Sequence, residues 1–320
     1  MILAGDIGGT KARLGLWTPD GHEHASQSLP SGDYASLETL IADFLHQQNI
    51  TQVTHISLGI AGPVATDSDG TYVATTNLPW RIEQHALAQR FSATVGLYND
   101  LVAVGYGAIS TTDAPLVLNP VPQQTGPAVV LAAGTGLGAA LFYPQSEDWQ
   151  CQPSEAGHVD FAPVDDQQVA LLNWLRTEFA HVSYERILSG DGFSRLYRFC
   201  CQQQGVNEVI DLTRPDANAA ITAAANQQTD PAAVEAVALF ARIMGAKAGN
   251  LALTCLPSQG VYLAGNISGV IAPFLQTHFM PAFTNKGRFE SLLADIPVFI
   301  TANPRLGLYG AYQLAKCEQE

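Results

Sequence analysis

The acidic residues best placed for chemistry stand beside a glycine turn and at the end of a strand-like run. Asp6 precedes the turn Gly8-Gly9-Thr10, and Asp100 follows the apolar run that ends at Asn99. A carboxylate at the carboxyl end of a strand lies where α/β sheets commonly bind ligands, and it can accept a proton from an attacking hydroxyl. This position predicts that Asp100 is a general base. The alternative is that Asn99-Asp100 is an ordinary N-cap of the following helix.

Two glycine turns could hold phosphate. Gly8-Gly9-Thr10 and Gly134-Thr135-Gly136 each separate two strand-like runs. Glycines allow close approach, so turn amides and a threonine hydroxyl can point at phosphate oxygens, and the carboxylate of Asp6 suits a hydrated magnesium ion. Either turn alone could be a plain hairpin, and neither has the spacing of a P-loop or of a dinucleotide-binding loop. The two together predict that one polyphosphate is held from opposite sides.

A short polar segment between apolar runs could bind a sugar. Glu155 and His158 offer an acceptor and a donor within four residues. Such a pair suits the vicinal hydroxyls of a polyol, and Glu185 could supply a further acceptor. The alternatives are a solvated turn with a surface histidine and, for Glu185, an exposed helix position. A metal site at His158 and Asp160 is disfavoured because no second histidine lies at ligand spacing.

Strands and helices alternate along the chain, which favours an α/β layer architecture. The runs 3–17 and 129–142 share one pattern of strand, glycine turn and strand, so the chain is expected to be internally duplicated. The apolar spacing predicts further elements. Helices are expected over 34–48, 82–91, 230–256 and 306 to about 316, and strands over 53–60, 94–98, 261–264 and 296–300.

Length and charge narrow the class of protein. A chain of 320 residues with 47% apolar residues predicts two lobes with a cleft between them. Fifteen basic and 29 acidic residues give a net charge of −14, which argues against nucleic acid and an anionic membrane as partners. The first residues lack the pattern of a signal peptide, and the apolar run 128–143 is too short for a bilayer. A cytoplasmic protein is therefore expected. Its five cysteines are odd in number and scattered, so its thiols are expected to be reduced.

The chain resembles the bacterial glucokinase family of the actin-like, hexokinase-like ATPase superfamily over nearly its whole length. Several motifs, in the same order as in that family, carry the resemblance. The resemblance implies an α/β, two-lobed actin-like ATPase (ribonuclease H-like) fold with duplicated strand-turn-strand cores. It also implies a small domain of residues 1–108 plus 302–320 and a large domain of residues 109–301. The motifs are Gly5-Asp6-Ile7-Gly8-Gly9-Thr10 with Arg13, Ala61-Gly62-Pro63-Val64, Thr76-Asn77-Leu78-Pro79-Trp80, Asn99-Asp100, Ala133-Gly134-Thr135-Gly136-Leu137-Gly138, Glu155 to Phe161 and Ser183 to Gly190.

The resemblance further implies a glycolytic glucokinase that transfers phosphate from ATP to the 6-hydroxyl of glucose and forms a homodimer. Asp100 would be the base, and Asp6 would hold Mg²⁺ through water. The residues implied to bind glucose are Asn99, Asp100, Glu155, His158 and Glu185. Those implied to hold the ATP phosphates are Gly5, Asp6, Ile7, Gly8, Gly9, Thr10, Gly134, Thr135 and Gly136.

Two features separate this chain from its relatives and from neighbouring families. Many glucokinases carry a Gly-Gly pair near the adenosine, whereas this chain has Gly265-Asn266. The repressor/open-reading-frame/kinase family usually follows its Glu-x-Gly-His motif with a cysteine-rich zinc site, and none follows His158.

A non-catalytic sugar sensor and an ATPase acting on water are the rival classes. A sensor would need neither Asp6 nor Asp100, and an ATPase would release ADP without sugar.

Overall fold

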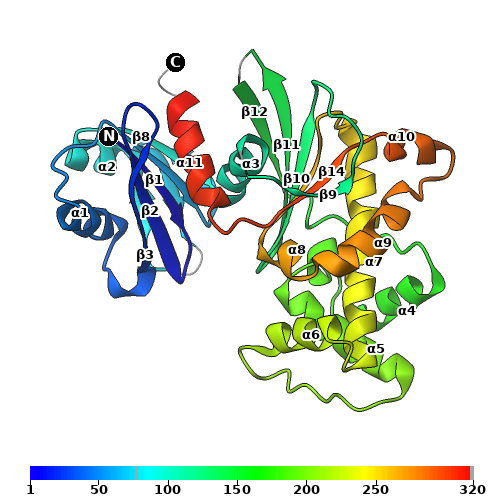
Figure 1. Cartoon of the computed structure of the whole chain (residues 1–320). Coiled ribbons are helices and arrows are strands. Elements are labelled where there is room, and N and C mark those ends of the chain that lie inside the picture. The colour runs from blue at the N-terminus through cyan, green and yellow to red at the C-terminus, as the bar shows by residue number, and fades with distance from the viewer. Residues whose placement is uncertain (76–77, 112, 147, 318–320) are drawn as a thin grey trace. The chain divides into compact units, whose positions relative to one another are not determined.

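A computed structural model describes residues 1–75, 78–111, 113–146 and 148–317 (Figure 1). The chain divides into two compact units. Unit 1 comprises Met1–Ala114 and Pro304–Glu320, and unit 2 comprises Pro115–Asn303. The domain boundaries expected from the sequence lie a few residues earlier at both points.

Unit 1 is built on a five-stranded mixed sheet with the order β3-β2-β1-β4-β8. The first three strands pair antiparallel, and β4 and β8 then run parallel to β1. The central strands are buried almost throughout, as their continuous apolar runs predict. The bounds are β1 (Ile2–Ile7), β2 (Lys11–Trp17), β3 (Glu23–Pro30), β4 (His55–Ile60) and β8 (Thr94–Asn99).

Helices complete unit 1. Helix α1 begins at Leu37, later than the sequence suggested, because the Ser36 and Thr39 side chains form a capping box. Helices α3 and α11 lie against each other where glycines leave room: a Cβ on Gly107 would collide with the Leu306 carbonyl, and one on Gly310 with that of Ala103. The bounds are α1 (Leu37–Gln47), α2 (Gln84–Phe91), α3 (Asp100–Ser110) and α11 (Leu306–Cys317), with a 3₁₀ turn η1 (Ser31–Asp33).

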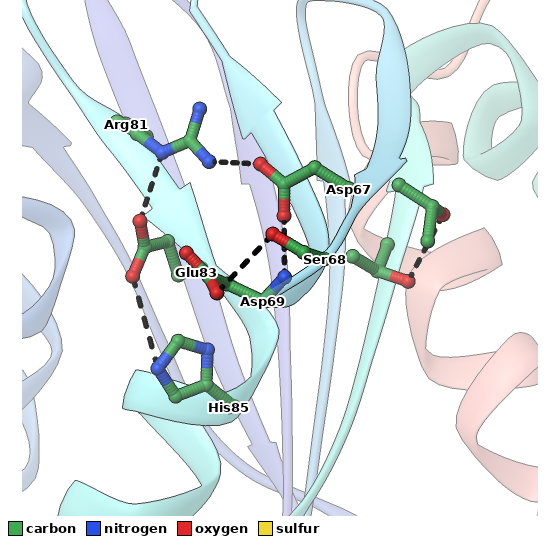
Figure 2. A network of polar contacts seen from close by, with 8 residues as sticks. Asp67, Ser68, Asp69, Arg81, Glu83 and His85 are labelled. Atoms are coloured by element: carbon green, nitrogen blue, oxygen red, sulfur yellow. Dashed lines mark hydrogen bonds and ion pairs between the residues drawn. The ribbon is translucent and has the colours of Figure 1, made fainter.

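A small antiparallel sheet of β5 (Val64–Asp67), β6 (Gly70–Ala74) and β7 (Arg81–Glu83) also belongs to unit 1. The sequence suggested a helix from residue 82, but that residue lies in β7. Figure 2 shows the Arg81 guanidinium between the carboxylates of Asp67, at 2.7 Å, and Glu83, at 2.8 Å. Through its ion pair with Asp67, Arg81 connects β7 to the end of β5. The motif residues Thr76 and Asn77 lie outside the described residues.

Unit 2 repeats the sheet of unit 1. Its order is β12-β11-β10-β13-β14-β9, in which an antiparallel hairpin pair is again followed by two parallel strands. The expected internal duplication is therefore confirmed, with β9 added antiparallel at one edge. The bounds are β9 (Leu116–Asn119), β10 (Ala128–Ala133), β11 (Leu137–Gln145), β12 (Asp148–Ser154), β13 (Gly260–Ala264) and β14 (Val298–Thr301).

Helix α7 (Pro231–Cys255) forms the centre of the unit 2 core and confirms the helix expected over 230–256. The Asp230 side chain caps it, and Gly245 and Gly249 let it lie against the α9 backbone, as Figure 1 shows. Helix α7 is long and apolar enough to cross a membrane, but 78% of its most apolar window is buried inside the protein. The other helices are α4 (Asp166–Leu175), α5 (Gly190–Gln204), α6 (Ala217–Asn226), α8 (Asn266–Val270), α9 (Ala272–Thr284) and α10 (Glu290–Ala294), with 3₁₀ turns η2 (Tyr184–Arg186) and η3 (Gly287–Phe289).

Candidate active site

The two predicted catalytic carboxylates of unit 1 come to one edge of its sheet. The parallel register aligns Ile7 of β1 with Ile60 of β4, and Ile60 with Asn99 of β8. Asp6 is the last residue but one of β1, and Asp100 directly follows β8. Both carboxylates therefore lie at the carboxyl ends of parallel strands, where α/β sheets bind ligands.

Asp6 is a largely buried carboxylate with one cationic partner. Its side chain is 23% exposed, and its Oδ2 lies 3.2 Å from Nη1 of Arg13, directly opposite on β2. Burial raises the pKa of Asp6, and the charge and hydrogen bond of Arg13 act in the opposite direction. The Asp6 carboxylate therefore has oxygen lone pairs that the Arg13 hydrogen bond does not use, next to the glycine turn 8–10.

The turn after Asp6 is held by a residue that the sequence analysis missed. The Gly8 amide donates to the Lys11 carbonyl at 3.0 Å, which closes the turn. Ser31 is fully buried, and its hydroxyl donates to the Gly8 carbonyl at 2.8 Å while its amide donates to that of Thr10 at 3.1 Å. Nothing in the sequence links Ser31 to this turn, because the contact forms only when η1 folds over it. Thr10 itself remains exposed.

Asn99 is the N-cap of α3, as the simpler interpretation of Asn99-Asp100 held. Its side-chain oxygen accepts from the Leu101 amide at 3.0 Å, and its amide nitrogen donates to the Gly62 carbonyl at 3.1 Å. The Asn99 side chain thus fixes both the start of the helix and the loop of the Ala61 to Val64 motif. Through this bond, the motif Ala61 to Val64 is held at the same edge of the sheet as Asn99, although the two are far apart in the sequence.

Asp100 occupies the first helical position, with Oδ1 accepting from the Leu101 amide at 2.9 Å. Burial raises the pKa of Asp100, and the negative charge of Asp6 adds to this effect. The helix can start so close to the sheet because Gly59 has no side chain: a Cβ there would lie 2.6 Å from that of Ala103. Asp100 therefore combines a fixed position with increased proton affinity, which are the properties of a general base.

In unit 2, the turn 134–136 occupies the position that 8–10 occupies in unit 1. Gly134 donates to the Gly136 carbonyl at 2.8 Å, and the Gly190 amide at the start of α5 donates to the Gly134 carbonyl at 2.9 Å. The Leu137 amide, directly after the turn, donates to Oε2 of Glu185 at 3.0 Å. The turn is therefore held at both ends by the segment 185–190.

The structure brings three of the predicted sugar-binding side chains together in unit 2. Phe161 donates to the Val182 carbonyl and Glu185 to that of Gly157, so the two motifs pair along their backbones. This pairing leaves Nε2 of His158 at 3.8 Å from Oε2 of Glu185 and at 3.9 Å from Oε2 of Glu155. The Glu155 side chain is 92% exposed and that of His158 is 57% exposed, so both are accessible to a ligand.

A cavity of about 580 Å³ opens beside the turn 134–136 in unit 2. Its size is that of a typical small-molecule site. Gly265, at φ +91°, makes the approach of α8 possible, since a Cβ there would lie 2.7 Å from the Ala133 carbonyl. Most of the residues that line the cavity were not predicted from the sequence, because they come from helices far apart in the chain. The cavity is lined by Gly134, Thr135, Gly190, Phe193, Asn218, Ala219, Thr222, Ala223, Asn226, Asn266, Ile267 and Val270.

Within the residues that the structure describes, no three or more His, Cys, Asp or Glu side chains gather into a metal-binding group. The acidic donors at the sheet edge of unit 1 are instead Asp6 and Asp100. Such a sparse oxygen set fits Mg²⁺, which usually keeps several waters and is held by one or two carboxylates together with substrate phosphates. It does not fit a closed zinc site, which needs four protein ligands.

Comparison with known proteins gives one consistent family. The family model described as Glucokinase matches residues 3–318. A glucokinase from a Nostoc species is 36% identical, with 97% of each chain covered. Among solved structures, the glucokinase from an Antarctic psychrotroph has a TM-score of 0.85 at 26% identity and covers 99% of this chain and 98% of its own. The glucokinase from Balamuthia mandrillaris in complex with glucose has a TM-score of 0.75 at 25% identity, covering 98% and 93%. The predicted two-lobed actin-like ATPase fold is confirmed.

Proposed function

The chain belongs to the glucokinase family and catalyses the ATP-dependent phosphorylation of glucose, and we propose that Asp100 is the base that deprotonates the 6-hydroxyl. The proposal rests on one observation: the Leu101 amide holds the Asp100 carboxylate at the carboxyl edge of the unit 1 sheet, near the charge of Asp6, where burial raises its pKa. A base with increased proton affinity is a better acceptor as the hydroxyl attacks phosphorus. The products are glucose 6-phosphate and ADP.

Glucose recognition is assigned to Asn99, Asp100, Glu155, His158 and Glu185. Glu155, His158 and Glu185 would bind sugar hydroxyls, because Nε2 of His158 lies 3.9 Å from the Glu155 carboxylate and 3.8 Å from that of Glu185, which supply acceptors. Asn99, directly beside the base, would also contribute. Since its two polar groups already bond to Leu101 and Gly62, it would contribute to the sugar only through the remaining lone pair and amide hydrogen.

The nucleotide would use the two duplicated turns and the cavity. Backbone amides and hydroxyls of residues 5–10 and 134–136 would bind the phosphates, in keeping with the anion-binding geometry of such turns. The cavity beside Gly134 and Thr135 would take the adenosine, because its volume and its mixed apolar and amide lining suit a nucleoside. Asn266 would then contact the nucleoside where many relatives have a second glycine.

Asp6 would hold Mg²⁺, in part through water. When bound, this ion would neutralise charge on the phosphate oxygens. The protein's own residues would do the rest: Asp100 accepts the proton of the 6-hydroxyl, and the oxygen forms its bond to the γ-phosphorus as the bond to the β–γ bridging oxygen breaks. The amides of the turns would stabilise the transferring oxygens.

Further properties follow from the family resemblance. We assign the protein to the cytoplasm, to glycolysis and to a homodimer, with no nucleic acid or membrane as partner. The net charge of −14 supports the last point, because it repels anionic polymers and surfaces. The small and large domains are assigned to residues 1–108 plus 302–320 and 109–301.

A coupled assay of ADP release tests the function. The purified protein with MgATP is expected to release ADP only when glucose is added, one ADP for each glucose 6-phosphate formed. Release without sugar would instead indicate an ATPase, and binding of glucose without any release would indicate a sensor. Sedimentation velocity tests the dimer.

A further inference from the structure

The peptide after the second phosphate turn is contacted by both predicted sugar-binding motifs. The Leu137 amide donates to Oε2 of Glu185 at 3.0 Å. On its other side, the Leu137 carbonyl lies so close to Gly157 that a Cβ on that glycine would collide with it. Residues proposed to bind phosphate and residues proposed to bind sugar therefore meet at the Leu137 peptide.

Gly136 makes room for the Glu185 carboxylate. A Cβ on Gly136 would lie 2.6 Å from Oε2 and 3.3 Å from Cδ of Glu185. A Cβ on Gly32, which lies in the 3₁₀ turn η1 and has no proposed binding role, would have nothing within 4 Å. Neither glycine has a positive φ, so alanine is compatible with the backbone at both. An added methyl group would therefore meet the Glu185 carboxylate at Gly136 and open space at Gly32.

A second bond fixes the other end of the turn to the same segment. The Gly190 amide donates to the Gly134 carbonyl at 2.9 Å, and only three residues separate the end of the 3₁₀ turn η2 at Arg186 from the start of α5 at Gly190. Of these three, Ile187 and Leu188 are buried in the core. A change in the position of Glu185 is therefore passed to the turn rather than absorbed by a loose loop.

We infer that Glu185 couples glucose binding to nucleotide binding, with Gly136 as the positioning residue that admits its carboxylate. A carboxylate can accept about four hydrogen bonds, so Glu185 can bind the Leu137 amide and a sugar hydroxyl together. A bound hexose fixes the Glu185 side chain and, through Leu137, the turn that receives phosphate. The coupling must be reciprocal, so each ligand tightens the other by the same factor. The inference rests on the proposed role of Glu185 as a sugar ligand.

Titration calorimetry on the full chain tests this inference. Glucose is titrated alone and with saturating Mg-AMPPNP, a non-transferable ATP analogue. The wild type is expected to bind glucose alone and to bind it several-fold more tightly with the analogue. Gly136→Ala is expected to weaken glucose binding about tenfold without any nucleotide and to reduce the coupling factor to near one. Gly32→Ala is expected to keep glucose affinity within twofold of the wild type.

The possible failures are distinguishable. Wild-type glucose affinity in Gly136→Ala, or equal weakening in both alanine variants, would overturn the inference while leaving the proposed function in place. A wild type that binds no glucose would overturn both. Circular dichroism melts of the two variants check that each is folded before its affinity is compared.

Discussion

Gly307, in the first turn of α11, lies directly against the carboxylate of Asp6. A Cβ on Gly307 would lie 2.9 Å from Cγ of Asp6 and 3.1 Å from each of its oxygens. The last helix of the chain therefore forms part of the wall around a carboxylate in its first strand. Its amino-terminal end carries partial positive charge, which favours a carboxylate at that place.

Gly307→Ala should displace Asp6 without unfolding the protein. Alanine is a better helix former than glycine by about 1 kcal/mol, so α11 itself is not weakened. The added methyl group must push the carboxylate away, and a displacement of this kind can cost about tenfold or more in turnover. Steady-state kinetics with varied MgATP measure the loss. Gly32→Ala is the control, because a Cβ there would have nothing within 4 Å. Equal turnover in both variants would contradict the prediction.

The sequence predicted what depends on neighbouring residues and missed what depends on distant ones. The duplicated hairpins, α7 and the strand before Asp100 were predictable because apolar spacing and glycine turns are local signals. Ser31 and Gly307 were not, since each acts on a turn or carboxylate to which only the tertiary fold brings it. Asn218 lines the cavity from a helix that no motif marked.

Asp100→Asn should remove the base while keeping its position. Asparagine can still accept the hydrogen bond of the Leu101 amide, so α3 should begin unchanged. The loss of a general base is expected to lower turnover by about a hundredfold to ten-thousandfold. Glucose affinity, measured by calorimetry, should change little. Turnover near that of the wild type would remove Asp100 from the mechanism.

The same variant should be more stable than the wild type at neutral pH. The pKa of Asp100 is raised in the folded protein, so its stabilising contribution is present below the unfolded pKa and lost as pH rises through the folded value. Asparagine does not titrate, so its stability advantage should be greatest at neutral pH and should shrink toward acid pH. Urea unfolding at pH 7 and pH 4.5 checks the sign.

The acid limb of the pH–rate profile should depend on Asp6. The charge of Asp6 contributes to the raised pKa of Asp100, after burial. Asp6→Asn removes that charge, so the pH below which kcat/KM for glucose falls should move to a lower value. Turnover also drops, but the position of the limb is independent of its height. A limb that stays in place, or moves upward, would argue that Asp100 is not the titrating group.

Lys247 should destabilise the fold through its charge. It is 3% exposed in α7, its Nζ lies 4.9 Å from the Tyr184 ring centroid, and burial lowers its pKa from 10.5 to about 8. Between these values the unfolded chain binds more protons than the folded one, so stability due to this group rises with pH. Lys247→Met should raise the free energy of unfolding at pH 7 by roughly 1 to 3 kcal/mol, allowing for the lost cation–π contact. The advantage over wild type should decline between pH 8 and pH 10.5 in urea titrations. A constant difference across that range would show that charge is not its cause.

Filling the unit 2 cavity should separate nucleotide binding from sugar binding. Ala223 lines the cavity from α6 and is exposed there, so a phenylalanine can enter the open space without disturbing the core. If adenosine occupies this cavity, Ala223→Phe competes with it for volume and should raise the KM for ATP about tenfold or more, because the bound nucleoside would lose its packing contacts. The KM for glucose should stay within about twofold, since the sugar cluster of Glu155, His158 and Glu185 does not line this cavity. Ala220→Phe, on the same helix but outside the cavity lining, controls for a general effect on α6. An unchanged KM for ATP in Ala223→Phe would place the adenosine elsewhere, and equal effects in both variants would trace the loss to the helix rather than to the cavity.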